Sequence, residues 1–301
     1  MTLPIDGLSR IADRYDVLLS DVWGVIHNGR EAFGEPCAAL ARWRIERGPV
    51  VLISNSPRPR ADVATQLDEL GVPRASWSAL VTSGDVTRAL LAARAPGPAW
   101  PIGPERDAGL YEGLGLDFAP AERAAFIACT GLFDDETETP DDYRARLAGP
   151  AARRLEMVCA NPDIVVQRGE RLIWCGGALA RLYETLGGPV VMAGKPFAPI
   201  YDECLARAAA LAGATPDRRR VLAIGDAVAT DVAGARQQGL DVLFIAAGIH
   251  GDGAVGADGR IDGAALDALL AQSGLTADFA MPSLRWDAAP AAAKAPAPVR
   301  G

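Results

Sequence analysis

Short apolar runs alternate with helical patterns along this chain, and this alternation constrains its fold more than any other feature. Five runs have the length of a strand, and each passes into polar or small residues: 17–20, 50–53, 190–193, 221–224 and 242–246. Helical patterns that end close to a glycine cover 36–47, 60–70, 198–211 and 231–238. We therefore expect an α/β fold with a doubly wound parallel sheet, covered by helices on both faces.

More than a hundred residues separate the second of these strands from the third, which is too long for a loop in a compact domain. We expect residues 84–188 to form an inserted α/β domain, and 1–83 with 189–281 to form a discontinuous core. The inserted segment should contain strands near 125–128 and 157–160, a helix at 178–186 and a hairpin in IVVQRGERLIW that turns at Arg168 and Gly169. The Ala- and Pro-rich composition of 282–301 predicts a disordered tail.

The composition excludes several classes of function. A net charge of -8 and a pI near 4.9 argue against a nucleic-acid partner and against a membrane surface. If the protein handles a phosphate group, a local site must therefore bind it. No apolar segment reaches the ~18 residues of a membrane span, and the N-terminus lacks a signal pattern, so we expect a cytoplasmic protein. The five cysteines are odd in number and lack C-x-x-C spacing, which indicates small buried residues.

Polar residues follow four of the predicted strands. They are Asp21, Ser54, Lys195 and Asp226. Ligands of open parallel sheets bind beyond the carboxyl ends of the strands, where these side chains should meet. Each one alone has an ordinary structural explanation, but together they supply ligands for a hard divalent cation and donors for a phosphate.

The segment VLAIGDAVATDVAGARQQG carries two of the acidic residues. Gly225 allows a sharp turn at the strand end, Asp226 then projects over the edge, and Asp231 falls where a helix begins. Helix capping explains Asp231 without any function but does not explain Asp226 equally well. We expect Asp21 and Asp226 to be direct Mg²⁺ ligands, and Asp231 to be a third ligand or an acceptor that supports one.

Lysine is rare in this chain. Of the 30 basic residues only Lys195 and Lys294 are lysine, and Lys294 lies in the predicted tail. The motif AGKP is not a Walker loop, because proline follows the lysine. An ammonium is a compact charge that can bridge a carboxylate and a phosphate oxygen, which suggests that the small head group matters here.

These segments together resemble the haloacid dehalogenase (HAD) superfamily of phosphoryl-transfer enzymes over about residues 15–248. The position of the inserted domain resembles the class IIA, NagD-like branch of that superfamily, and ISNSPRP, CANPD and AGKP look like segments of its phosphatases. The resemblance implies a HAD-like core, a substrate-covering cap domain and a Mg²⁺-dependent phosphatase for a small phosphorylated metabolite. A sugar or nucleotide phosphate would suit it, and a homodimer through the cap is left open.

The resemblance also implies roles for single residues. Asp21 becomes the nucleophile that forms an aspartyl-phosphate, assisted by Lys195. The phosphate ligands become Ser54, Asn55 and Lys195, and the metal ligands become Asp21, the backbone carbonyl of Trp23, Asp226 and Asp231.

Trp23 departs from the pattern of the family. The usual first motif is D-x-D, whose second Asp is the general acid, whereas this chain has D-V-W. Strand alternation places Trp23 on the same side as Asp21, and an indole N–H has no useful acidity. Acid–base catalysis is worth ~10² to 10⁴ in rate. Three explanations stay open: an acyl, aryl or pyrophosphate-like leaving group, a proton from another residue, or binding of a phosphorylated ligand for regulation without turnover.

His27 is the nearest candidate for a substitute acid, since its ordinary pKa suits the task. It precedes Asn28-Gly29, which favours a tight turn, and the simpler interpretation is a partly exposed hairpin histidine. His250 is a weaker candidate.

Asn161 and Asp163 could touch substrate, whereas Arg58 and the acidic stretch 134–142 are most simply solvated. Carbon–halogen or carbon–phosphorus cleavage also uses an Asp nucleophile, but halide chemistry gives no reason for metal-binding acids.

Overall fold

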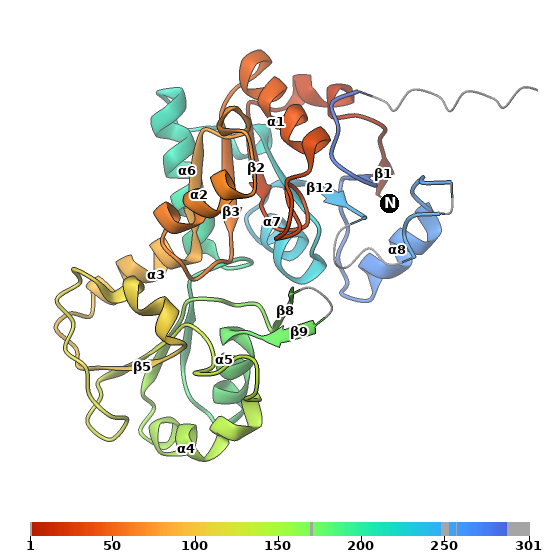
Figure 1. Ribbon diagram of the computed structural model, residues 1–301. Coiled ribbons are helices and arrows are strands. Elements are labelled where there is room, and N and C mark those ends of the chain that lie inside the picture. Colours follow the sequence, from red (N-terminus) through yellow and green to blue (C-terminus); the bar gives the residue numbers. More distant parts are fainter. Residues whose placement is uncertain (1, 169–170, 248–252, 257, 288–301) are drawn as a thin grey trace, which may run out of the picture.

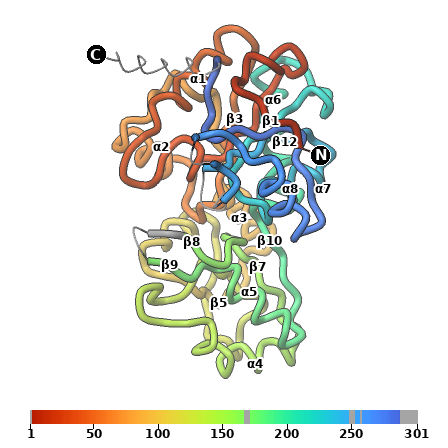
Figure 2. Tube along the Cα trace, turned by 90° about the vertical axis from the view of Figure 1, so that its right-hand side faces the viewer, coloured from red at the N-terminus to blue at the C-terminus, as the bar shows by residue number. Residues whose placement is uncertain are grey.

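The computed structural model describes residues 2–168, 171–247, 253–256 and 258–287. They form two α/β units, a large one with the N-terminus and a small one that lies beside it (Figure 1). Figure 2 shows the same two units after a turn of 90°. The predicted α/β class is confirmed, and none of the helices in the described part of the chain is long and apolar enough to cross a membrane.

The large unit contains a seven-stranded sheet in which every neighbouring pair is parallel. Its order is β1 (Leu3–Pro4), β13 (Phe279–Met281), β12 (Asp241–Ile245), β11 (Val221–Gly225), β2 (Val17–Asp21), β3 (Val50–Ser54) and β4 (Ala79–Thr82). The register pairs Ser20 with Ile224 and Asp21 with Ile53. The central strands β11, β2 and β3 therefore end at nearly the same level.

Helices cover both faces of this sheet, as expected for strands that are apolar on both sides. One apolar cluster joins the sheet to α1 (Gly34–Glu46) and α2 (Arg60–Glu69), and the other joins it to α6 (Ala198–Ala212), α7 (Ala233–Gln237) and α8 (Gly263–Ala271). Short helical turns lie at Leu8–Arg10, Ala12–Arg14, Arg74–Ser76, Arg218–Arg220 and Val228–Val232.

The small unit contains a four-stranded parallel sheet in the order β10 (Val190–Met192), β7 (Glu156–Cys159), β6 (Phe126–Cys129) and β5 (Ala99–Ile102). Its helices are α4 (Arg144–Ala152) and α5 (Gly176–Thr185), with short turns at Glu105–Tyr111 and Pro140–Tyr143, and α3 (Ser83–Ala92) leads into it. The predicted hairpin exists as antiparallel β8 (Val165–Arg168) and β9 (Arg171–Trp174). Gly169, the second of its predicted turn residues, lies outside the described residues.

Two expectations about organisation are wrong. The strand near residue 190 pairs with β7, Val190 beside Met157, so it completes the small sheet rather than the core sheet. An apolar run does not specify which sheet it joins. A short parallel crossover through α5 connects β7 to this strand, which favours their pairing. Residues 282–287 are also ordered rather than part of a disordered tail, because Leu284 is fully buried and Ser9 N–H donates to the Trp286 carbonyl. Residues 288–301 lie outside the described part.

All five cysteines are buried and free, as predicted.

Candidate active site

A cleft of about 1030 Å³ lies beyond the carboxyl ends of β2, β3 and β11. Its walls come from both units, since it is lined by Asp21, Ser54 and Asp226 of the large unit and by Thr130, Asp163 and Trp174 of the small unit. The edge of the sheet that the sequence points to is therefore open to a ligand and is faced by the inserted segment.

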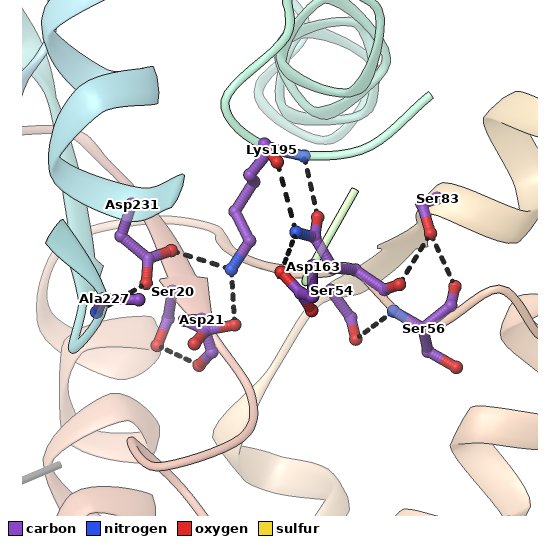
Figure 3. A network of polar contacts seen from close by, with 10 residues as sticks. Ser20, Asp21, Ser54, Ser56, Ser83, Asp163, Lys195, Ala227 and Asp231 are labelled. Atoms are coloured by element: carbon purple, nitrogen blue, oxygen red, sulfur yellow. Dashed lines mark hydrogen bonds and ion pairs between the residues drawn. The ribbon is translucent and has the colours of Figure 1, made fainter. Parts of the chain in front are cut away.

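Lys195 lies at the centre of the polar cluster (Figure 3). Its Nζ donates to Asp21 Oδ1 at 2.6 Å and to Asp231 Oδ1 at 2.7 Å, and all three residues are buried. The predicted route of the lysine is wrong, because Lys195 follows β10 of the small sheet and reaches the cluster from the loop before α6. The prediction that it approaches Asp21 is confirmed.

Asp226 joins Asp21 and Asp231 in a cluster of three buried carboxylates. One oxygen from each lies within 4.8 Å of the others, a spacing that suits a single cation. Gly225 matters for a reason other than the expected turn: a Cβ on it would lie 2.1 Å from Cγ of Asp231, so only glycine permits this approach. Asp231 lies in one π-helical turn, Val228–Val232, and its Oδ2 accepts from the Ala227 N–H at 3.1 Å.

The charges in the cluster are strongly coupled. Burial raises the pKa of Asp21, the nearby carboxylate of Asp231 raises it further, and Lys195 only partly opposes the rise. Burial lowers the pKa of Lys195, but Asp21 and Asp231 outweigh burial and hold that pKa well above its ordinary value. Lys195 is therefore protonated at neutral pH, and its ammonium bonds two of the three acidic side chains.

Ser54 ends β3 and Asn55 follows it, but their side chains make different contacts. Ser54 lines the cleft, and its Oγ accepts from the Ser56 N–H at 3.2 Å. Asn55 Oδ1 accepts from the Lys195 N–H at 2.7 Å, while its Nδ2 donates to Asp163 Oδ1 at 2.9 Å and to the Lys195 carbonyl at 3.2 Å. These bonds use both amide hydrogens of Asn55, so its side chain holds the lysine loop. Asn55 also lines the cleft, and its contact with phosphate stays a prediction.

Trp23 and His27 lie together in the lining of the cleft. Their rings meet edge to face with centroids 5.2 Å apart, and the indole packs so closely over Gly29 that a Cβ there would lie 2.2 Å from Trp23 Cη2. His27 is buried rather than partly exposed, its Nδ1 accepts from the Gly29 N–H at 2.9 Å, and burial lowers its pKa to about 4. At neutral pH the imidazole is therefore uncharged and has no proton of suitable acidity, which weakens the case for His27 as a substitute acid. His250 lies outside the described residues.

The small unit adds cleft residues that the sequence did not reveal. Asp107 and Thr130 are buried in its wall, and Asp135 of the acidic stretch also lines the cleft, where it pairs with Arg106. Arg58 lines the cleft from the large unit and donates to Gln66 Oε1 at 3.3 Å. No sequence signal identifies Asp107 or Thr130, because their place in the cleft depends on how the two units face each other.

Asn161 and Asp163 of CANPD line the cleft, and their contact with substrate stays a prediction. Asp163 reaches the large unit through Asn55, and Asn161 Oδ1 accepts from the Asp163 N–H at 3.0 Å. This stretch therefore links the small unit to the lysine loop.

Comparisons with known proteins agree with this arrangement. A family model described as haloacid dehalogenase-like hydrolase matches residues 18–117, and a second model, described as HAD-hydrolase-like, matches residues 192–270. A crystal structure from Brucella suis 1330, titled a hydrolase of the haloacid dehalogenase-like family, is 44% identical, covers 93% of this chain and 99% of its own, and has a TM-score of 0.81.

Two further relatives come from Mycobacterium tuberculosis. The curated D-glycerol 3-phosphate phosphatase is 28% identical over 251 residues, which are 81% of this chain. The chain spans 66% of the length of that curated relative. A glycerol phosphate phosphatase structure in complex with magnesium is 28% identical, covers 79% of this chain and 70% of its own, and has a TM-score of 0.60.

Proposed function

The chain belongs to the haloacid dehalogenase-like hydrolases, and we propose that it is a Mg²⁺-dependent phosphohydrolase of a small phosphorylated metabolite, of the sugar- or nucleotide-phosphate type. One observation carries the proposal. Lys195 Nζ bonds both Asp21 at 2.6 Å and Asp231 at 2.7 Å, with Asp226 beside them, at one edge of a cleft of about 1030 Å³. Burial of charged groups costs free energy, so three buried acidic groups and a buried ammonium beside a cleft are typical of an active site.

The proposed reaction has two steps. A carboxylate oxygen of Asp21 attacks phosphorus, and the leaving group departs with the electrons of the broken P–O bond. Water then hydrolyses the aspartyl-phosphate, which releases inorganic phosphate and restores Asp21. The Lys195 ammonium orients Asp21 and offers positive charge to the phosphoryl oxygens, and Ser54 Oγ offers a hydrogen bond. Asn55 positions Lys195 through its backbone.

The residues present fit a bound Mg²⁺. Three carboxylate oxygens lie within 4.8 Å of one another, and oxygen ligands are those that Mg²⁺ prefers. We propose Asp21, Asp226, Asp231 and the backbone carbonyl of Trp23 as the residues that hold the ion. When bound, it supplies positive charge that neutralises the phosphoryl group.

We propose that the large unit is the catalytic core and that the small unit is the cap over the substrate. The described residues of 2–83 and 193–287 form the core that carries the reacting groups, and the segment between them, which ends with β10 at Met192, is the cap. The cleft lies where residues of both meet, so the cap would cover a bound substrate.

Trp23 favours a second candidate function, the binding of a phosphorylated ligand without turnover for regulation. Its indole lines the cleft two residues after Asp21, in the place of the family's acid. The loss of a general acid slows the departure of alkoxide leaving groups far more than that of acyl, aryl or pyrophosphate-like groups.

A panel of phosphate esters assayed with MgCl₂ decides between the two functions. Phosphate release from aryl or acyl phosphates by the wild type, and its loss in Asp21→Asn, is the expected result. If the wild type releases no phosphate from any ester yet binds inorganic phosphate, the regulatory function replaces the enzymatic one.

A further inference from the structure

The cleft contains an apolar surface that the proposed chemistry does not use. Among the described residues, nine large apolar side chains are exposed, and four of these line the cleft. The four, which we call the apolar ledge, are Ile164, Leu172, Trp174 and Phe197. Exposed apolar side chains that gather in one place indicate a binding surface, whereas scattered ones need no explanation.

The hairpin β8–β9 and the residue before it supply three of these side chains. Figure 1 and Figure 2 both place the hairpin on the side of the small unit that faces the large unit. Leu172 is 68% exposed and Trp174 is 38% exposed, while Ile173 between them is buried. Because side chains alternate along a strand, Leu172 and Trp174 lie on the same face of β9, and both line the cleft.

The apolar ledge adjoins the proposed phosphate site from two directions. Ile164 directly follows Asp163, whose carboxylate is 2.9 Å from Asn55 Nδ2, and Asn55 holds the Lys195 loop. Phe197 follows Lys195 by two residues and is 38% exposed. A phosphate bound at Lys195 would therefore lie in the same cleft as the apolar ledge, which the rest of its molecule can contact.

We infer that the apolar ledge binds an aromatic ring of the substrate, so that the substrate class is phosphate esters that carry an aromatic or heteroaromatic ring. This inference rests on the proposed function. A flat ring can stack on Trp174 and Phe197 and bury their exposed surface, whereas a polyol would leave that surface in water. A ring attached to the ester oxygen also stabilises the departing anion, which suits a site with Trp23 in place of the acid.

Binding of two phosphonates tests the inference without any turnover, because their carbon–phosphorus bond is not an ester. Calorimetry in MgCl₂ compares phenylphosphonate with methylphosphonate. The wild type should bind phenylphosphonate about 10-fold more tightly, and Trp174→Ala should reduce this preference to about 3-fold or less. Ile45→Ala removes an 86% exposed side chain on α1 that does not line the cleft, so it should keep the full preference.

The possible failures are distinguishable. Equal binding of the two phosphonates overturns the inference and leaves the proposed function standing. Absence of binding for both phosphonates and for inorganic phosphate overturns the proposed function, and the inference with it. If Trp174→Ala does not fold, Leu172→Ala replaces it and should likewise reduce the preference for phenylphosphonate. If sedimentation shows a dimer that Trp174→Ala dissociates while the ring preference is unchanged, the apolar ledge is a contact between copies and the inference is wrong.

Discussion

Asn55 and Lys195 are joined by two reciprocal hydrogen bonds, although 140 positions separate them in the chain. The Lys195 N–H donates to Asn55 Oδ1 at 2.7 Å, and Asn55 Nδ2 donates back to the Lys195 carbonyl at 3.2 Å. The same Nδ2 donates to Asp163 of the small unit at 2.9 Å. One amide therefore fixes the loop that carries the ammonium and ties that loop to the cap.

Asn55→Ala should lower kcat by up to about 100-fold, because a lysine displaced by about 1 Å no longer meets the phosphoryl group correctly. The buried Lys195 N–H also loses its acceptor, which should cost about 1–3 kcal/mol of unfolding free energy. Steady-state kinetics on an aryl phosphate and urea denaturation measure the two effects. Asp163→Ala is the matched control, since it removes the acceptor of the Asn55 contact to the small unit and keeps both hydrogen bonds between Asn55 and Lys195. Equal losses of kcat in the two variants would show that Asn55 does not act through Lys195.

Asp107 should make stability fall as the pH rises. Burial raises its pKa, opposed in part by the Thr130 hydroxyl and by Arg106, so the folded state holds this proton at pH values where the unfolded state has lost it. The stability contributed by this group is full below the unfolded pKa of 3.8 and declines as the pH rises through the folded pKa. Asp107→Asn removes this effect.

Urea denaturation at pH 4 and pH 7 tests the prediction. Relative to the wild type, Asp107→Asn should gain unfolding free energy between the two pH values, because only the wild type loses the contribution of the protonated carboxyl group. Asp68→Asn, an exposed change on α2, serves as the control and should gain nothing. A gain that is absent, or that Asp68→Asn shares, means that the Asp107 carboxylate is not held at an energetic cost.

The sequence predicted the parts of the site that depend on strand ends and missed those that depend on the placement of the two units. Asp21, Ser54 and Asp226 follow strands whose continuous apolar character identifies them as buried central strands, so their meeting follows from parallel topology. Lys195 arrives from β10, and apolar periodicity does not tell which sheet a strand joins. Asp107 and the three ledge residues Ile164, Leu172 and Trp174 lie on the wall supplied by the small unit, and no local pattern encodes which of its faces meets the large unit.

Magnesium should stabilise the folded protein through the three carboxylates. The single ammonium among these three acidic groups does not neutralise all of them, so binding of a dication favours the folded state. A MgCl₂ concentration of about 100 times the dissociation constant adds ~2.7 kcal/mol, which thermal denaturation detects as a rise in Tm. Asp226→Asn should abolish most of the rise, and Asp68→Asn should keep it. A similar rise in the wild type and Asp226→Asn would place the ion elsewhere.

Trp23→Asp should extend activity to alkyl phosphates. The indole lines the cleft two residues after Asp21, where a carboxylic acid would be able to protonate a departing alkoxide. Since positioned acid–base catalysis is worth ~10² to 10⁴ in rate, kcat for an alkyl ester should rise by at least about 10² relative to the wild type, while kcat for an aryl ester with a good leaving group changes little. Trp23→Asn creates the same space beside His27 and Gly29 without acidity, so it separates proton transfer from simple access. A folded Trp23→Asp protein with no gain on alkyl esters, or with a gain that Trp23→Asn matches, would mean that the leaving-group proton comes from another source.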